Sequence, residues 1–153
     1  MNDEIKKMWQ IFAVGKDSIL ELRALASDKV AIVKLFRADQ FGSTDDLKVA
    51  FEQAALKLNE RGYNIYTVMN PIKTDFQVES ARDEDIRYRD LLLIDIDRVG
   101  SPKQPATDKE VKAAKQLAKG IIAYLAALGW PNQPIQVMSG NGWHIYWQLD
   151  DLV

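Results

Sequence analysis

Two aspartates, Asp95 and Asp97, close the apolar run Leu91 to Ile94 and stand two positions apart. Residues at this spacing on a β-strand point to the same face, about 6–7 Å apart along the backbone. Carboxylates held this close repel each other, and a hard cation such as Mg²⁺ or Mn²⁺ stabilises both in the ionised form. The sequence therefore favours a metal site at Asp95 and Asp97, of the kind that phosphoryl transfer uses. Two solvated aspartates at a strand end are the plain alternative.

The only histidine of the chain, His144, follows a turn that contains two glycines. The turn is formed by Ser139, Gly140, Asn141 and Gly142. Glycine allows positive φ and close approach of the backbone, while N–H groups, hydroxyls and amides bind phosphate oxygens. The pattern indicates a nucleotide-binding segment that ends in His144. A structural histidine behind an ordinary Asn-Gly hairpin turn explains the same residues without a ligand.

Hydrophobic periodicity predicts the elements that position these residues. Strands are expected at 19–25, 29–36, 63–69, 91–97, 135–138 and 143–149, and helices at 2–12, 44–60 and about 107–128. This order predicts an α+β fold with a ferredoxin-like or RNA-recognition-motif-like, mostly antiparallel sheet, helices on one side and additional N-terminal elements. The polar segment 72–88 is long for a loop, so we expect it to border the functional site.

Alternation within the last strands separates apolar from polar side chains. Leu92, Ile94 and Ile96 are expected to face the helices, which leaves both aspartates on the other face of the sheet. In the return strand, His144 lies on the face opposite Ile145. In that strand Tyr146 and Gln148 share the face of His144, and Trp143 and Trp147 share the face of Ile145.

The composition limits the class of protein. A chain of 153 residues with 47% hydrophobic content can bury one sizeable core, so a single domain over 1–153 is expected. Within it we expect an N-terminal module at about 1–72, the loop at about 72–88 and a motif-bearing part at about 89–153. The formal net charge of −2 argues against a strong generic polyanion binder, so any nucleic-acid contact must be local.

Cysteine usage and hydropathy indicate the compartment. The chain has no cysteine, which excludes disulfides, thiolate zinc sites and a cysteine nucleophile. Its first residues are acidic, and no segment approaches the roughly 18–20 apolar residues of a membrane span. We therefore expect a cytoplasmic protein without a membrane partner.

Several segments together resemble one protein family. The motifs LLLIDID and SGNGWHIYW, with YLAALGWP between them, resemble the archaeo-eukaryotic primase superfamily, specifically the primase-polymerases of phages, plasmids and related mobile elements. The segments ILELRAL and YNIYTVMNPI resemble the N-terminal module of those proteins, so the likeness spans about residues 9–149. By position, Asp95 and Asp97 match the family's metal-binding acids. Ser139 and His144 match its second motif, which contacts the phosphates of the incoming nucleotide.

The resemblance implies template-directed, metal-dependent nucleotidyl transfer for replication priming. Its substrates would be nucleoside triphosphates on a single-stranded DNA template, its cofactor Mg²⁺ or Mn²⁺, and its partner a fused or associated helicase. Arg23, Tyr66 and Asn70 are further expected to line the site, although Tyr66 can equally pack in the sheet and Arg23 can form a structural ion pair with Glu21.

One part of the family pattern is missing. The family has a third metal-binding acid on a later strand, and this chain reaches Val153 without it. Asp150 lies six residues beyond His144, roughly 20 Å along a straight strand, which is too far to complete the site. The expectation is the N-terminal portion of a longer primase, or a shortened form, with little or no polymerase activity of its own.

A non-catalytic module is the alternative. An RNA-recognition-like sheet binds nucleotides or nucleic acid through exposed aromatic side chains, and Tyr146 or Trp147 would serve this purpose. Dependence on metal separates the two hypotheses, because the acidic pair repels phosphates unless a cation is present. A rolling-circle endonuclease is disfavoured, because the proteins it would resemble need a pair of histidines.

Overall fold

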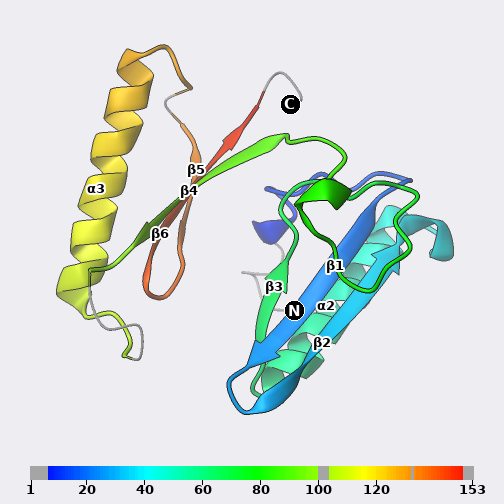
Figure 1. Ribbon diagram of the computed structural model, residues 1–153. Helices are drawn as coiled ribbons and strands as arrows, with labels where there is room; N and C mark the ends of the chain where they lie inside the picture. Colours follow the sequence, from blue (N-terminus) through cyan, green and yellow to red (C-terminus); the bar gives the residue numbers. More distant parts are fainter. Residues whose placement is uncertain (1–6, 100–103, 132, 150–153) are drawn as a thin grey trace. The chain divides into compact units, whose positions relative to one another are not determined.

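The computed structural model describes residues 7–99, 104–131 and 133–149. The chain divides into two compact units, the first ending at Asp90 and the second beginning at Leu91. In the described residues each unit combines a three-stranded antiparallel sheet with one long helix (Figure 1). This confirms the α+β fold class, with the strands distributed over two sheets.

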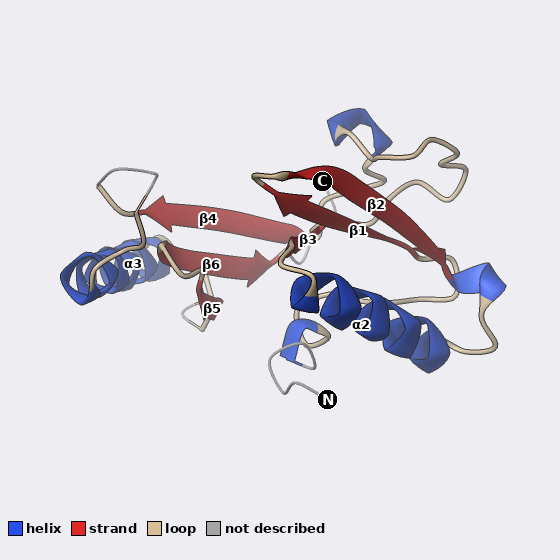
Figure 2. Ribbon diagram, turned by 90° about the horizontal axis from the view of Figure 1, so that it is seen from below, coloured by secondary structure: helices blue, strands red, loops and turns tan. Residues whose placement is uncertain are grey.

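The first unit is built on the strand order β2-β1-β3. Its elements are β1 (Ile19–Ala26), β2 (Lys29–Arg37), η1 (Ala38–Gln40), α2 (Thr44–Glu60) and β3 (Asn64–Thr67). Ser43 begins α2, because its side chain accepts a hydrogen bond from the backbone N–H of Asp46. Gly62, at φ +82°, follows the end of the helix. Figure 2 shows α2 lying along one face of this sheet.

The core of the first unit lies between α2 and β1. Phe51, Ala55 and Leu58 of the helix pack against Leu22 and Ala24 of the strand, and all five are buried. Helical spacing on α2 and alternation on β1 bring these residues together. The odd-numbered residues of β1, which include Glu21 and Arg23, consequently face away from the helix.

The segment after β3 folds back on the face of the sheet that α2 leaves open. Ile72 and Phe76 form a buried cluster with Ile19 of β1, and Ile72 makes an isolated bridge with Ile86. The short helix η2 (Asp83–Asp85) lies within this segment. Apolar anchors at its start and end therefore fix the long polar loop on the sheet.

The second unit has the strand order β4-β6-β5. Its elements are β4 (Leu91–Asp97), α3 (Asp108–Ala127), β5 (Ile135–Met138) and β6 (Gly142–Gln148). A capping box opens α3, as the sequence predicts. The Glu110 N–H donates to Thr107 Oγ1 at 3.3 Å, and the Thr107 N–H donates to Glu110 Oε2 at 2.7 Å.

The core of the second unit confirms the predicted faces of the strands. Ile96 and Ile145 pack with Ala114 and Ala118 of α3, and Leu92 and Ile94 lie against the same cluster. Trp147 belongs to this core, is 1% exposed and donates from Nε1 to the carbonyl oxygen of Pro131 at 3.0 Å. The suggestion that Trp147 stacks on a base is therefore wrong, because its ring is buried.

Two predicted elements differ from the structure. The strand expected at 63–69 spans only Asn64–Thr67, because β3 pairs with β1 over four residues before the chain reaches Asn70-Pro71. Of the helix expected at 2–12, residues 2–6 lie outside the described residues, residues 7–8 are helical and residues 9–11 form turns. These turns place Trp9 on α2, where its Nε1 donates to Glu52 at 2.6 Å. None of the helices in the described part of the chain combines the length and apolar composition needed to cross a membrane.

Candidate functional site

Asp95 and His144 lie directly opposite each other on β4 and β6. Side chains of such cross-strand partners share one face of the sheet, here the face opposite α3. Nε2 of His144 is 3.1 Å from Oδ1 of Asp95, and their side chains are 26% and 51% exposed. The structure thus brings the two sequence motifs into direct contact at a site that solvent can reach.

Asp97 lies on the same face, two residues beyond Asp95 and opposite Gly142. Both carboxylates are exposed. No group of three or more His, Cys, Asp or Glu residues arranged to hold a metal ion occurs among the described residues. Mg²⁺ usually takes only one or two carboxylates and completes its shell with phosphate oxygens and water. The donor set at Asp95 and Asp97 fits such a cation, and Asp150 and Asp151 lie outside the described residues.

Tyr146 is a third member of the site. Its hydroxyl lies 3.2 Å from Nδ1 of His144, and the two rings meet edge to face with centroids 6.0 Å apart. Burial raises the pKa of Tyr146 above its usual value, and the negative charge of Asp95 raises it further. The sequence predicted Tyr146 on the strand face of His144, but the function suggested for it was base stacking. Its spacing of two residues from His144 on one strand was the signal that links them.

The turn before β6 is held by its own polar groups. Ser139 Oγ accepts from the Gly142 N–H at 3.1 Å, and Asn141 Oδ1 accepts from the Ala106 N–H, just before α3, at 3.2 Å. Positive φ occurs at Gly140, at +95°, and at no non-glycine residue of the described chain. Asn141-Gly142 is therefore not a type I′ pair, since that turn needs positive φ at both residues. The side-chain oxygens of Ser139 and Asn141 bind within the protein in this structure.

Arg98 fixes the end of β4 next to Asp97. Its largely buried side chain places Nη1 3.5 Å from Oε1 of Glu110 and donates from Nη2 to the carbonyl oxygen of Gln104. The hydrogen bond from the Thr107 hydroxyl is the main cause that lowers the pKa of Glu110, and Arg98 adds to the effect. The start of α3 is thereby tied to the strand that carries both aspartates.

The first unit contains a pocket of about 270 Å³ on the face of its sheet opposite α2. Arg23 and Tyr66 line it and are direct cross-strand partners on β1 and β3. Tyr66 is 52% exposed. Asn70 is not among the lining residues. It is buried, and its Oδ1 accepts from the Asp90 N–H at 3.1 Å.

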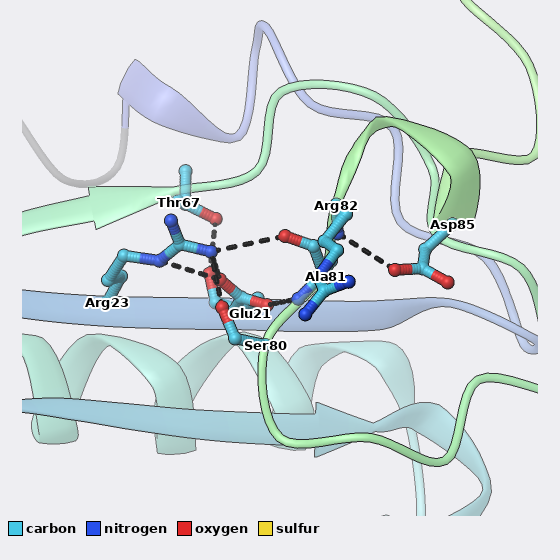
Figure 3. Close-up of polar contacts among 7 residues, drawn as sticks. All are labelled: Glu21, Arg23, Thr67, Ser80, Ala81, Arg82 and Asp85. Atoms are coloured by element: carbon cyan, nitrogen blue, oxygen red, sulfur yellow. Dashed lines mark hydrogen bonds and ion pairs between the residues drawn. The ribbon is translucent and has the colours of Figure 1, made fainter.

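A buried carboxylate organises this pocket (Figure 3). The Glu21 side chain is fully buried, and its Oε1 accepts from Nε and Nη2 of Arg23 at 3.0 and 2.6 Å. Its Oε2 accepts from the Ala81 N–H at 2.5 Å, while Arg23 also donates to Ser80 Oγ at 2.6 Å. Glu21 therefore anchors the 72–88 segment, which borders this pocket through Ala81 and Arg82. The guanidinium of Arg23 is held in place and is 37% exposed.

Comparison of the chain with protein-family models, with curated proteins and with solved structures gives no match. The proposed function therefore rests on the geometry of four residues, Asp95, Asp97, His144 and Tyr146.

Proposed function

We propose that this chain carries part of a primase-polymerase site, which performs metal-dependent nucleotidyl transfer for replication priming in the cytoplasm. The direct pairing of Asp95 with His144 carries the proposal. An acid suited to a divalent cation and a ring N–H suited to a phosphate oxygen stand 3.1 Å apart on one accessible sheet face. A metal-bound triphosphate needs these two functions side by side.

Each side chain has a separate task in this site. Asp95 and Asp97 would hold Mg²⁺ or Mn²⁺, which when bound neutralises charge on the reacting phosphates. His144 donates from Nε2 to a phosphate oxygen. The turn of residues 139–142 precedes it on β6, and the N–H groups of Ser139, Gly140 and Gly142 bind within the protein. Tyr146 lies on the far side of the imidazole from Asp95.

The charges of the site make nucleotide binding depend on a cation. Two exposed carboxylates repel a triphosphate, and the formal net charge of −2 supplies no general attraction. Because only two carboxylates gather here among the described residues, we expect weak metal and nucleotide binding and little primer synthesis by this chain. The same proposal includes a single-stranded DNA template as a binding partner and a fused or associated helicase as a second one.

The first unit offers complementary chemistry for a nucleotide or a template strand. Arg23 presents a fixed cation that suits a phosphate, and Tyr66 presents an exposed ring that suits a base. This pocket also favours the second candidate function, a nucleic-acid-binding module without catalysis, because Arg23 and Arg82 accompany its two acids, Glu21 and Asp83, and Glu21 is paired with Arg23. The two functions can be distinguished by the residues that nucleotide binding requires and by whether binding requires a divalent cation.

Binding of a fluorescent, non-hydrolysable nucleoside triphosphate, with Mg²⁺ or Mn²⁺ and with a chelator, tests the proposal. The variant is Asp95→Asn with Asp97→Asn. The matched control is Asp28→Asn with Asp75→Asn, which removes the same charge from exposed positions of the first unit. We expect the chelator to abolish binding, the site variant to raise the Kd at least about tenfold, and the control to leave it unchanged. Binding that persists in chelator and survives the site variant would establish the non-catalytic module instead.

A further inference from the structure

Tyr146 contacts the imidazole of His144 through both its hydroxyl and its ring. Its hydroxyl lies 3.2 Å from Nδ1, on the side of the imidazole away from Asp95, which contacts Nε2. Leu93 and Ile135 are its neighbours across the two adjoining strands, so apolar side chains flank the phenol on the open sheet face. Half-burial between these strands gives the hydroxyl a restricted set of positions.

When the imidazole is neutral and Asp95 carries its charge, the donors and acceptors of the three side chains fit one arrangement of protons. The ionised carboxylate of Asp95 only accepts, so the 3.1 Å contact requires a hydrogen on Nε2 of His144. In the neutral imidazole Nδ1 then carries a lone pair, and the Tyr146 hydroxyl is the donor that satisfies it. The ordinary phenol pKa of about 10 keeps that donor protonated at neutral pH. Two hydrogen bonds therefore run in one direction, from Tyr146 through His144 to Asp95.

We propose that Tyr146 is a positioning residue, whose hydroxyl holds the His144 ring with its Nε2–H directed toward the edge that receives a nucleotide phosphate. This inference rests on the proposed function. A phosphate oxygen, like the Asp95 carboxylate, accepts hydrogen bonds, so a ring that donates from Nε2 can serve either group. Without the Tyr146 hydroxyl the ring can rotate or carry its hydrogen on Nδ1, which would turn a lone pair toward the phosphate.

Tyr146→Phe removes the hydroxyl and keeps the ring that packs against His144. Tyr124→Phe is the matched control, because it removes a tyrosine hydroxyl from an exposed position on α3 of the same unit. The first readout is the ¹⁵N spectrum of the imidazole, which is unambiguous because the chain has one histidine. It is recorded at about pH 8.5, above the ordinary imidazole pKa of about 6.5. The second readout is the Kd of a non-hydrolysable nucleoside triphosphate with Mg²⁺.

In the wild type we expect a proton on Nε2 and an Nδ1 resonance typical of a hydrogen-bonded acceptor. Tyr146→Phe should move that resonance toward the position of a free acceptor and raise the Kd about three- to tenfold, the net effect of one hydrogen bond. Tyr124→Phe should change neither. A thermal unfolding midpoint for each variant reports whether the variant is folded under the assay conditions.

Three outcomes would overturn the inference. The first is an Nδ1 resonance that is unchanged by Tyr146→Phe, and the second is a wild-type ring that carries its proton on Nδ1. The wild-type spectrum alone supplies this second test, whatever the stability of the variant. The third is a Kd that rises in His144→Ala but not in Tyr146→Phe. If the resonance moves but the wild type binds no nucleotide, the positioning of His144 by Tyr146 is supported and the proposed function is the part that fails.

Discussion

Gly142 lies directly against the backbone of Ile96, so that a Cβ at residue 142 would stand 2.0 Å from the Ile96 carbonyl oxygen. Only glycine fits this approach, and it lets β6 begin its pairing with β4 opposite Asp97. That register is what sets Asp95 opposite His144 two residues further along the strands. Gly142 therefore contributes to the site indirectly, because it permits the strand register that brings Asp95 and His144 together.

Replacing Gly142 with alanine should disrupt the β4–β6 pairing. The methyl group cannot share space with the Ile96 carbonyl, so we expect the free energy of unfolding to fall by about 1–3 kcal/mol or more. The matched control is Gly120→Ala on α3, where a Cβ would have no atom within 4 Å. Alanine favours a helix interior over glycine, so the control should stabilise the protein by about 0.5–1 kcal/mol. Urea unfolding measures both, and equal effects of the two substitutions would contradict the structural role of Gly142.

Neutralising Glu21 should loosen the 72–88 segment. Glu21→Gln weakens the contacts to Arg23 and the Ala81 N–H, and hydrogen bonds to charged groups contribute about 1.5–3 kcal/mol. We therefore expect lower stability and faster proteolytic cleavage within 72–88. Asp17→Asn is the control, because the Asp17–Arg87 pair is exposed and should matter less. Unchanged cleavage in Glu21→Gln would show that the other contacts of the segment, which include the apolar anchors and the Arg37 hydrogen bond to the Phe76 carbonyl, hold it without Glu21.

Local sequence signals predicted most of the elements. The stripes on α2 and α3, and the alternation on β1, β4 and β6, each reflect a single buried face, which is why their bounds agree closely with the structure. The capping box at Thr107 follows equally from local chemistry. The sequence grouped Asp95 with Asp97 on one strand and set His144 apart from Ile145 on another, but the pairing of Asp95 with His144 comes from the structure.

Features that depend on distant pairing were not available from the sequence. Nothing local reveals that the strands separate into two sheets, or that β3 stops at Thr67. The sequence suggested an ion pair of Glu21 with Arg23, which the structure shows, but nothing local indicated that Glu21 also binds the N–H of Ala81, far along the chain. The hydrogen bond of Tyr146 to His144 depends on side-chain geometry that alternation does not specify.

The ionisation of Tyr146 should respond to Asp95. Burial is the larger cause of its raised pKa, and the carboxylate charge of Asp95 is the second. Asp95→Asn removes a negative charge that disfavours the tyrosinate, so the pKa of Tyr146 should fall but stay above the ordinary value of about 10. The difference between tyrosinate absorbance titrations with and without Tyr146→Phe isolates this group. Asp97→Asn is the control, and an equal shift there would contradict the specific effect of Asp95.

The same raised pKa should make the stability of the protein depend on pH in the alkaline range. A folded-state pKa above the unfolded value means that the folded state holds the phenolic proton more tightly. The stability contributed by this proton is fully present below the unfolded pKa of about 10 and is lost as the pH rises through the folded pKa. Tyr146→Phe has no such proton to lose, so above about pH 10 the unfolding free energy of the wild type should fall relative to that of the variant. Urea unfolding of both proteins at a series of pH values measures this difference. A difference that stays constant with pH would show that the Tyr146 phenol ionises alike in the folded and unfolded states.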